Sequence, residues 1–332
     1  MSNRNQQPQR TFAPRHARHA ATPYPQSRSD ARTARAHPSR AFASAHGAQT
    51  VRRSPQMREN PRRSHARAWR VVFWVAIVVF VCAAAALAVI GFSYWQGQQK
   101  YAAVAEGALS GEVSSLPSDD AASPSGGSVL AAEFVNWDVL LAENPDTVGW
   151  VYVPGTSVNY PIVQASDNET YLHTDFSGEE SWPVSYGAIF LDAACAGDFS
   201  SGNSIVYGHH MSDGSMFAPL ADLADTAAFN EHRTVYVFTP SANYRLETFA
   251  VVVVAPTDPL AQPEFADEQE RLDYLADKLA RSVVEPDPAV RPVEEIGRIF
   301  TFVTCTDYSA NDQRVVVFAS VVEEAASEGA GA

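Results

Sequence analysis

The chain has 332 residues and a formal net charge of −14, but the charge is distributed very unevenly. Residues 1–70 hold 15 arginines and only two acidic residues, whereas residues 71–332 hold 9 lysines and arginines and 36 acidic residues. Three cysteines are too few for a disulfide framework, which excludes the small disulfide-stapled secreted folds.

The first segment, residues 1–70, is rich in Arg, Pro, Ala, Ser and His and has few aliphatic residues. Such a composition cannot bury enough apolar surface to offset the entropy lost on ordering, so it predicts a disordered basic tail. A basic tail can bind nucleic acid. Its position directly before an apolar segment instead favours contact with membrane lipid, and we expect no nucleic-acid partner.

Residues 71–95 carry no charged side chain. As a helix they would extend roughly 37 Å, which is enough to cross a bilayer. Because the arginines lie before this segment, the positive-inside rule predicts a single-pass protein with residues 1–70 in the cytoplasm and the remainder outside the cell. The alternative is a cleaved secretory signal, with a candidate cleavage site at Ala103-Val104-Ala105. It is disfavoured because the apolar run is long and 70 residues precede it.

The part after the apolar segment divides by composition. Residues 96–130 contain many Gly, Ser, Pro and Ala residues together with acidic ones, which predicts a flexible stalk. A single folded domain is expected over 131–322. The small and acidic residues 323–332 predict a flexible C-terminal tail.

Two helices are expected in the domain. Apolar residues recur at helical spacing over 134–141, and Asn144-Pro145 ends that helix. A second helix is predicted over 267–283, where Asp267 and Glu270 have the spacing of a capping box and leucines form one apolar stripe.

Strand patterns are more numerous than helical ones. Several strands with few helices indicate a mainly β fold with added helices, a closed or nearly closed β-barrel with the second helix inserted between two strands. The strands are predicted at 149–153, 204–207, 234–239, 244–254, 298–304 and 314–320.

Three chemically distinctive side chains stand at strand ends. Cys305 ends one predicted strand, Arg314 begins the next, and His209 follows Tyr207-Gly208 at the end of another. A thiol, an imidazole and a guanidinium suggest acyl transfer, in which a thiolate attacks, an imidazole moves protons and a cation stabilises the oxyanion. His210 competes for the imidazole role, but adjacent strand residues face opposite ways, so only one can face the site. Zinc binding by both histidines is disfavoured, because no matching ligand cluster accompanies them.

The motifs around these residues resemble the class B sortases, membrane-anchored cysteine transpeptidases of Gram-positive bacteria. The resemblance covers about residues 133–321. It rests on Thr301-Phe302-Val303-Thr304-Cys305, on Tyr207-Gly208-His209 continuing through Met216-Phe217, on the segments 144–150, 154–156 and 160–164, on Asn168 through Leu172, and on the helix before the Cys305 strand. Two features depart from the pattern: Arg314 follows Cys305 by nine positions, where many members have eight, and Val303 stands where serine is usual.

The resemblance implies a fold, a reaction and its partners. The fold would be a sortase-like closed barrel with an N-terminal helix. Cys305 would attack a carbonyl in a sorting signal near the C-terminus of a secreted protein and form a thioacyl-enzyme. His209 would exchange protons with the leaving and entering amines, and Arg314 would hold the oxyanion. An amine of a peptidoglycan precursor, similar to lipid II, would then accept the acyl group and anchor the protein to the wall.

Further residues are candidates for substrate binding. Asn168 and Leu172 match substrate-groove positions of class B members, with capping and core packing as the alternative. The Thr306 backbone N–H would share the oxyanion with Arg314. Asp307 is either an orienting partner of His209 or a solvated loop acid.

No cofactor and no metal are expected. Glu264, Asp267, Glu268 and Glu270 resemble a calcium cluster, but acidic residues are favoured at a helix N-terminus in any case. Cys195 is expected to be a buried, inert thiol.

Two other functions remain open. A membrane-tethered cysteine endopeptidase would use the same three residues with water as acceptor. A non-enzymatic surface adhesin would have no need of them. A papain-like protease is disfavoured because there the cysteine precedes the histidine in sequence.

Overall fold

The computed structural model describes residues 62–111, 113, 116–117, 129–180, 183–259, 262–305 and 313–327, with 62–66 and Cys305 described by their backbone alone. The expected disordered tail at 1–61 therefore lies outside the described residues. So do Thr306 and Asp307.

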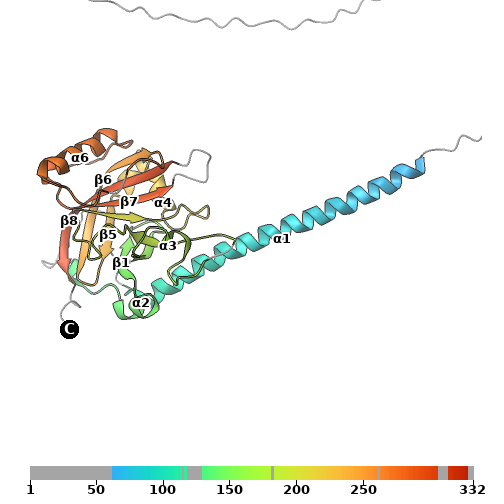
Figure 1. Ribbon diagram of the computed structural model, residues 1–332, viewed down its shortest axis with the longest axis horizontal. Helices are drawn as coiled ribbons and strands as arrows, with labels where there is room; N and C mark the ends of the chain where they lie inside the picture. The colour runs from blue at the N-terminus through green and yellow to red at the C-terminus, as the bar shows by residue number, and fades with distance from the viewer. Residues whose placement is uncertain are drawn as a thin grey trace, which may run out of the picture. The chain divides into compact units, whose positions relative to one another are not determined.

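The domain is built around a closed β-barrel with the strand order β1-β2-β3-β4-β7-β8-β6-β5 (Figure 1). The pairs β2–β3 and β4–β7 are parallel and the others are antiparallel. This confirms the prediction of a mainly β fold with a closed barrel. The strands are β1 Thr147–Tyr152, β2 Asn159–Val163, β3 Ile189–Leu191, β4 Asn203–Tyr207, β5 Thr234–Phe238, β6 Ala242–Val254, β7 Ile299–Cys305 and β8 Arg314–Ala326.

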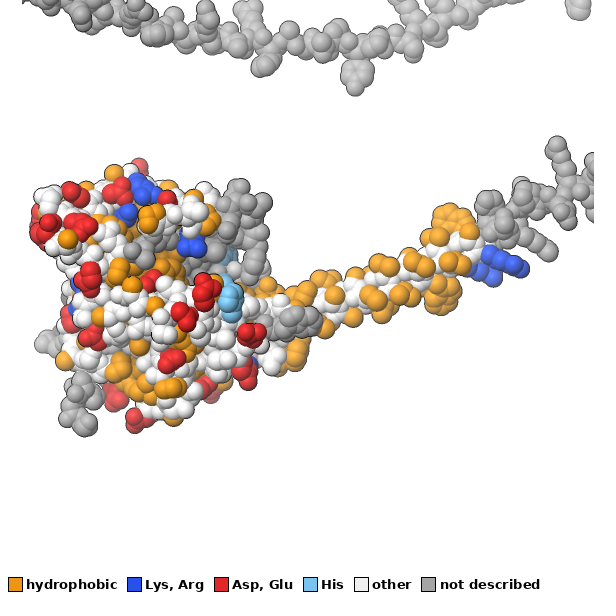
Figure 2. All heavy atoms as spheres, viewed as in Figure 1, with side chains coloured by type: hydrophobic (Ala, Val, Ile, Leu, Met, Phe, Trp, Pro, Cys, Tyr) orange, Lys and Arg blue, Asp and Glu red, His pale blue; other side chains and the backbone are white. Residues whose placement is uncertain are grey.

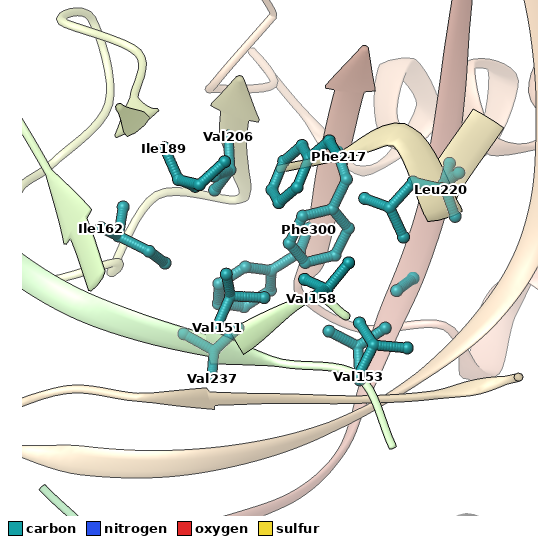
Figure 3. Packing of buried hydrophobic residues seen from close by; sticks show 14 of the residues in the cluster. Val151, Val153, Val158, Ile162, Ile189, Val206, Phe217, Leu220, Val237 and Phe300 are labelled. Atoms are coloured by element: carbon teal, nitrogen blue, oxygen red, sulfur yellow. The ribbon is translucent and has the colours of Figure 1, made fainter. Parts of the chain in front are cut away.

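β-Branched and aromatic residues fill the barrel because they pack well on a pleated, buried surface. Val151 of β1, Val237 of β5 and Phe300 of β7 are fully buried and lie together in the interior (Figure 3). Phe300 stacks on Phe302 of the same strand and on Phe199. The strands that carry the site are thus held by a packed core.

The helices lie between or beside the strands. They are α2 Trp137–Glu143, α3 Thr170–His173, α4 Ala218–Asp222, α5 Thr226–Glu231 and α6 Glu268–Arg281, with 3-10 turns at Val129–Ala131 and Val293–Glu295. As predicted, α2 ends before Pro145, and α6 lies in the chain between β6 and β7. The side chain of Asp267 caps α6 by accepting the Glu270 N–H, and Glu270 accepts the N–H of Ala266. These acidic residues therefore serve the helix N-terminus.

The N-terminal helix α1, Arg62–Ala108, is longer than the apolar run predicted it to be. Within the described residues it is the one helix long and apolar enough to cross a membrane. Its apolar side chains are exposed along most of its length, with arginines at the N-terminal end (Figure 2). The boundary expected at residue 70, between the tail and the helix, therefore lies after the start of the helix at Arg62. Alanine and arginine are good helix formers, so the helix begins before the apolar run.

The flexible stalk predicted for 96–130 is wrong over residues 96–108, which are the last turns of α1. The Gly, Ser and Pro residues of that range lie mostly after residue 108, whereas Gln, Lys and Ala before it favour a helix. Tyr101 is buried, and Lys100 pairs with Asp175 at 3.1 Å and Glu179 at 2.7 Å. Here α1 packs against the barrel domain. Residues 118–128 lie outside the described residues.

The flexible tail predicted from 323 is also wrong in its first part, because β8 continues to Ala326. Two acidic residues that suggested a frayed end are instead paired with arginines: Glu323 with Arg245 at 3.2 Å and Glu324 with Arg298 at 2.6 Å. Residues 328–332 lie outside the described part.

Candidate active site

The strand register brings three predicted positions to one end of the barrel. Parallel strands β4 and β7 pair Tyr207 with Val303, and the Gly208 N–H donates to the Val303 carbonyl at 3.1 Å. His209 and Cys305 each follow this pair by two residues, so both lie at the C-terminal ends of these parallel strands. Antiparallel strands β7 and β8 pair Cys305 with Arg314. The register thus directs all three positions to the same end of the barrel.

A cavity of about 290 Å³ opens at this edge. Its wall combines apolar side chains with a few polar groups, as is typical of a site that binds an organic ligand in one orientation. The lining residues are Asn168, Glu169, Leu172, Phe190, Tyr207, Gly208, His209, Val303, Thr304 and Arg314.

His209 is fixed from two sides. Its Nε2 lies 2.7 Å from the Leu172 carbonyl oxygen, and its own carbonyl accepts the Phe217 N–H at 2.9 Å. Because a carbonyl only accepts, Nε2 carries the proton in this contact, and Nδ1 is left for proton exchange in the neutral ring. His209 lines the cavity, whereas His210 forms a β-bridge with Met216. Of these two neighbouring histidines, His209 is therefore the one that lines the cavity.

Asn168 is held by a buried carboxylate that sequence analysis missed. Asp192 is 1 % exposed, and its Oδ2 accepts from Asn168 Nδ2 at 3.0 Å and from the Tyr207 hydroxyl at 2.8 Å. The Ala193 N–H donates to Asn168 Oδ1 at 2.8 Å. An acidic residue directly after the apolar run 188–191 is the signal that could have identified Asp192.

Two charged residues, Asp192 and Arg314, act on the Tyr207 hydroxyl in this wall. Burial raises the pKa of Tyr207, Asp192 raises it further, and the guanidinium of Arg314 acts in the opposite direction. Tyr207 therefore stays protonated and donates its hydrogen bond to Asp192. Arg314 supplies positive charge to the cavity, where a developing oxyanion would be stabilised.

The other residues singled out from the sequence lie in two places, at the cavity and in the core away from it. Asn168 and Leu172 line the cavity. Cys195 is buried away from this cavity's lining, with its sulfur 3.5 Å from the Asn203 carbonyl oxygen and 3.4 Å from the Ile205 nitrogen. This confirms the expectation of a buried thiol. Burial raises the pKa of the thiol to about 11, which disfavours the reactive thiolate.

Comparison with known proteins identifies relatives of this domain. The family model described as "Sortase domain" matches residues 151–322. Sortase B of Staphylococcus aureus (strain NCTC 8325 / PS 47) is 32 % identical over 181 residues, which are 54 % of this chain and 72 % of the relative.

Two solved structures have a similar fold. The Staphylococcus aureus sortase B–substrate complex has a TM-score of 0.50 and 30 % identity, covering 56 % of this chain and 84 % of that one. A crystal structure of sortase B complexed with triglycine has a TM-score of 0.50 and 30 % identity, covering 56 % of this chain and 85 % of that one.

Proposed function

This chain belongs to the sortase family as a class B cysteine transpeptidase, and we propose that it joins secreted proteins to the cell wall through Cys305, His209 and Arg314. The observation that best supports this assignment is the strand register: β7 and β8 pair Cys305 with Arg314, and β4 pairs with β7 two residues before His209 and Cys305. His209 and Arg314 line one cavity. The three residue types match the needs of acyl transfer.

The first step is cleavage of a sorting signal. The Cys305 thiolate attacks the carbonyl carbon of the scissile peptide bond, and the carbonyl oxygen becomes an oxyanion that the Arg314 guanidinium stabilises. As the tetrahedral intermediate collapses, the carbon–nitrogen bond breaks and protonated His209 gives its proton to the departing amine. A thioacyl-enzyme and the free C-terminal fragment result.

The second step is transfer to an amine. The amine nitrogen attacks the thioacyl carbon, neutral His209 takes the proton, and the Cys305 thiolate leaves. The complex of a similar sortase B with triglycine supports a small peptide amine as the acceptor class. We assign this role to the amine of a peptidoglycan precursor of the lipid II type.

Substrate binding is assigned to the part of the cavity wall beside His209, where Asn168 and Leu172 lie. An amide held by Asp192 suits recognition of an extended peptide backbone, and the Leu172 side chain suits an apolar residue. The oxyanion donor at Thr306 and the role of Asp307 stay predictions.

The proposed location follows from α1. A helix with arginines before an apolar run fits a single-pass anchor with a cytoplasmic N-terminus and an extracellular catalytic domain. In this arrangement the arginines near the start of α1 contact lipid headgroups.

The test uses the full chain in detergent micelles, candidate sorting peptides and triglycine. Mass spectrometry should detect a thioacyl adduct on Cys305 and a ligated product that forms at the expense of the hydrolysed one. Cys305→Ala should give neither product while unfolding at the same temperature. An adduct resolved by water alone, at every triglycine concentration, would identify an endopeptidase instead. No adduct with any peptide would contradict the assignment of Cys305.

A further inference from the structure

The imidazole of His209 rests on a glycine that has no room for a side chain. Gly187 has φ of +57°, a conformation that L side chains rarely adopt. A Cβ built on Gly187 would lie 2.6 Å from His209 Cδ2 and 3.0 Å from Nε2. The His209 ring therefore packs directly against Gly187, next to the Leu172 carbonyl that binds Nε2.

This glycine is held in turn by α1. The Tyr101 hydroxyl donates to the Gly187 carbonyl at 2.7 Å and accepts the Phe176 N–H at 3.3 Å. Tyr101 is 6 % exposed, and burial raises the pKa of its hydroxyl, so it remains a donor throughout the physiological range. A side chain of the N-terminal helix thus contacts the loop that supports His209.

Neighbouring contacts hold the same loop against α1. The Tyr186 hydroxyl lies between two acceptors, the Tyr94 carbonyl at 2.8 Å and the Asp213 carboxylate at 2.7 Å, and shares its hydrogen with both. The Tyr186 ring lies over Gly97, where a Cβ would come within 2.3 Å of it. Tyr186 and Gly187 are therefore both bound to the part of α1 that includes the end of the apolar run and the turns after it.

We propose that the last turns of α1 belong to the active-site framework, with Tyr101 and Gly187 acting as positioning residues for His209. The proposal rests on the proposed role of His209 in proton transfer. It makes the anchoring helix part of the catalytic geometry: if the helix shifts, the Gly187 carbonyl shifts and the imidazole loses its support. Misplacement of a catalytic group by about 1 Å can cost about 100-fold in rate.

The first comparison is Gly187→Ala with Gly178→Ala in the full chain. Gly178 has φ of +77°, and a Cβ added there would meet nothing within 4 Å, so it reproduces the backbone strain without a clash. We expect Gly187→Ala to lower kcat for thioacyl formation by about 100-fold and to change the pH profile of kcat. Gly178→Ala should retain the wild-type kcat and pH profile.

The second comparison is Tyr101→Phe with Tyr236→Phe. Tyr236 is also buried and also donates to a backbone carbonyl, that of Pro117 at 2.9 Å. Both changes remove one hydroxyl, so both should lower the unfolding temperature. Only Tyr101→Phe should lower kcat, by about 10-fold, with KM within about 2-fold of wild type. It alone should also move the imidazole NMR signal of His209, which is assigned by its loss in His209→Gln.

The outcomes separate this inference from the proposed function. If wild type forms no thioacyl adduct but the His209 signal moves in Tyr101→Phe, the reaction is misassigned and the positioning contact stands. If wild type is active, and Gly187→Ala and Tyr101→Phe match their controls in kcat, pH profile and ring signal, the positioning role is refuted.

Discussion

Replacing Arg314 by methionine should remove the charge that we propose stabilises the oxyanion, and leave the barrel intact. Arg314 begins β8 directly opposite Cys305, is half-buried, and lines the same cavity as His209. Loss of one such donor typically costs about 2.7–4 kcal/mol of transition-state stabilisation, or about 100- to 1000-fold in rate. We expect that range for Arg314→Met. Lysine keeps the charge but not the planar fork of donors, so Arg314→Lys should lose about 10-fold to 100-fold.

The assay is single-turnover formation of the thioacyl adduct, with peptide in excess and the reaction quenched in acid. The rate constant at saturating peptide reports the chemical step, and its concentration dependence reports binding. Arg298→Met is the matched control. Arg298 lies just before β7, where it donates to the Phe199 carbonyl at 3.2 Å and pairs with Glu324 at 2.6 Å, and it does not line the cavity.

Arg298→Met should unfold at a lower temperature than wild type and form the adduct at the wild-type rate. An Arg314→Met enzyme that keeps more than about a third of the wild-type rate constant would refute the oxyanion role. A loss confined to peptide binding would instead assign Arg314 to the substrate backbone.

Three further predictions concern the core, the buried thiol and the cavity wall. Phe300 is fully buried and stacked on two phenylalanines. Phe300→Ala should therefore lower the free energy of unfolding, measured by urea titration, by about 3–5 kcal/mol. A loss below about 1 kcal/mol would show that the core closes around the gap. Burial raises the pKa of the Cys195 thiol to about 11, so this thiol stays protonated below that pH. Iodoacetamide at pH 8 should therefore label it only after unfolding. Rapid labelling in the folded chain would contradict its burial. Asp192→Asn should raise KM for a sorting peptide by about 10-fold with kcat nearly unchanged, because the amide of Asn168 loses a charged acceptor. Steady-state kinetics would detect this split, with Asp222→Asn as the control, at an exposed residue that ends α4 and lies outside the cavity lining. A fall in kcat alone would contradict the prediction.

The barrel was predictable from sequence where strands are long and apolar. The strands that carry Cys305 and Arg314, and the strand that ends two residues before His209, were anticipated. Each has β-branched residues close to a chemically distinctive side chain. Strands β2 and β3 were not anticipated. β2 contains Pro161, which lacks an N–H for the ladder, and β3 has only three residues.

The parts of the site that depend on tertiary contacts could not be predicted. Gly187 and Tyr101 are 86 positions apart, and no local pattern marks either as a neighbour of His209. The docked end of α1 looked like a linker because its burial is supplied by residues far along the chain. Asp192 was missed for a similar reason, since its partners Asn168 and Tyr207 belong to different segments.

The parallel pairing of β4 with β7 also determines when the enzyme can become active. β5, β6 and α6 lie between these strands in sequence, so their pairing closes a long loop and must come late in folding. During synthesis, the N-terminal part of a chain emerges first. An emerging chain therefore presents His209 before Cys305 can be placed near it. The site proposed for acyl transfer is therefore incomplete until β7 and β8, the last two described strands, have joined the barrel.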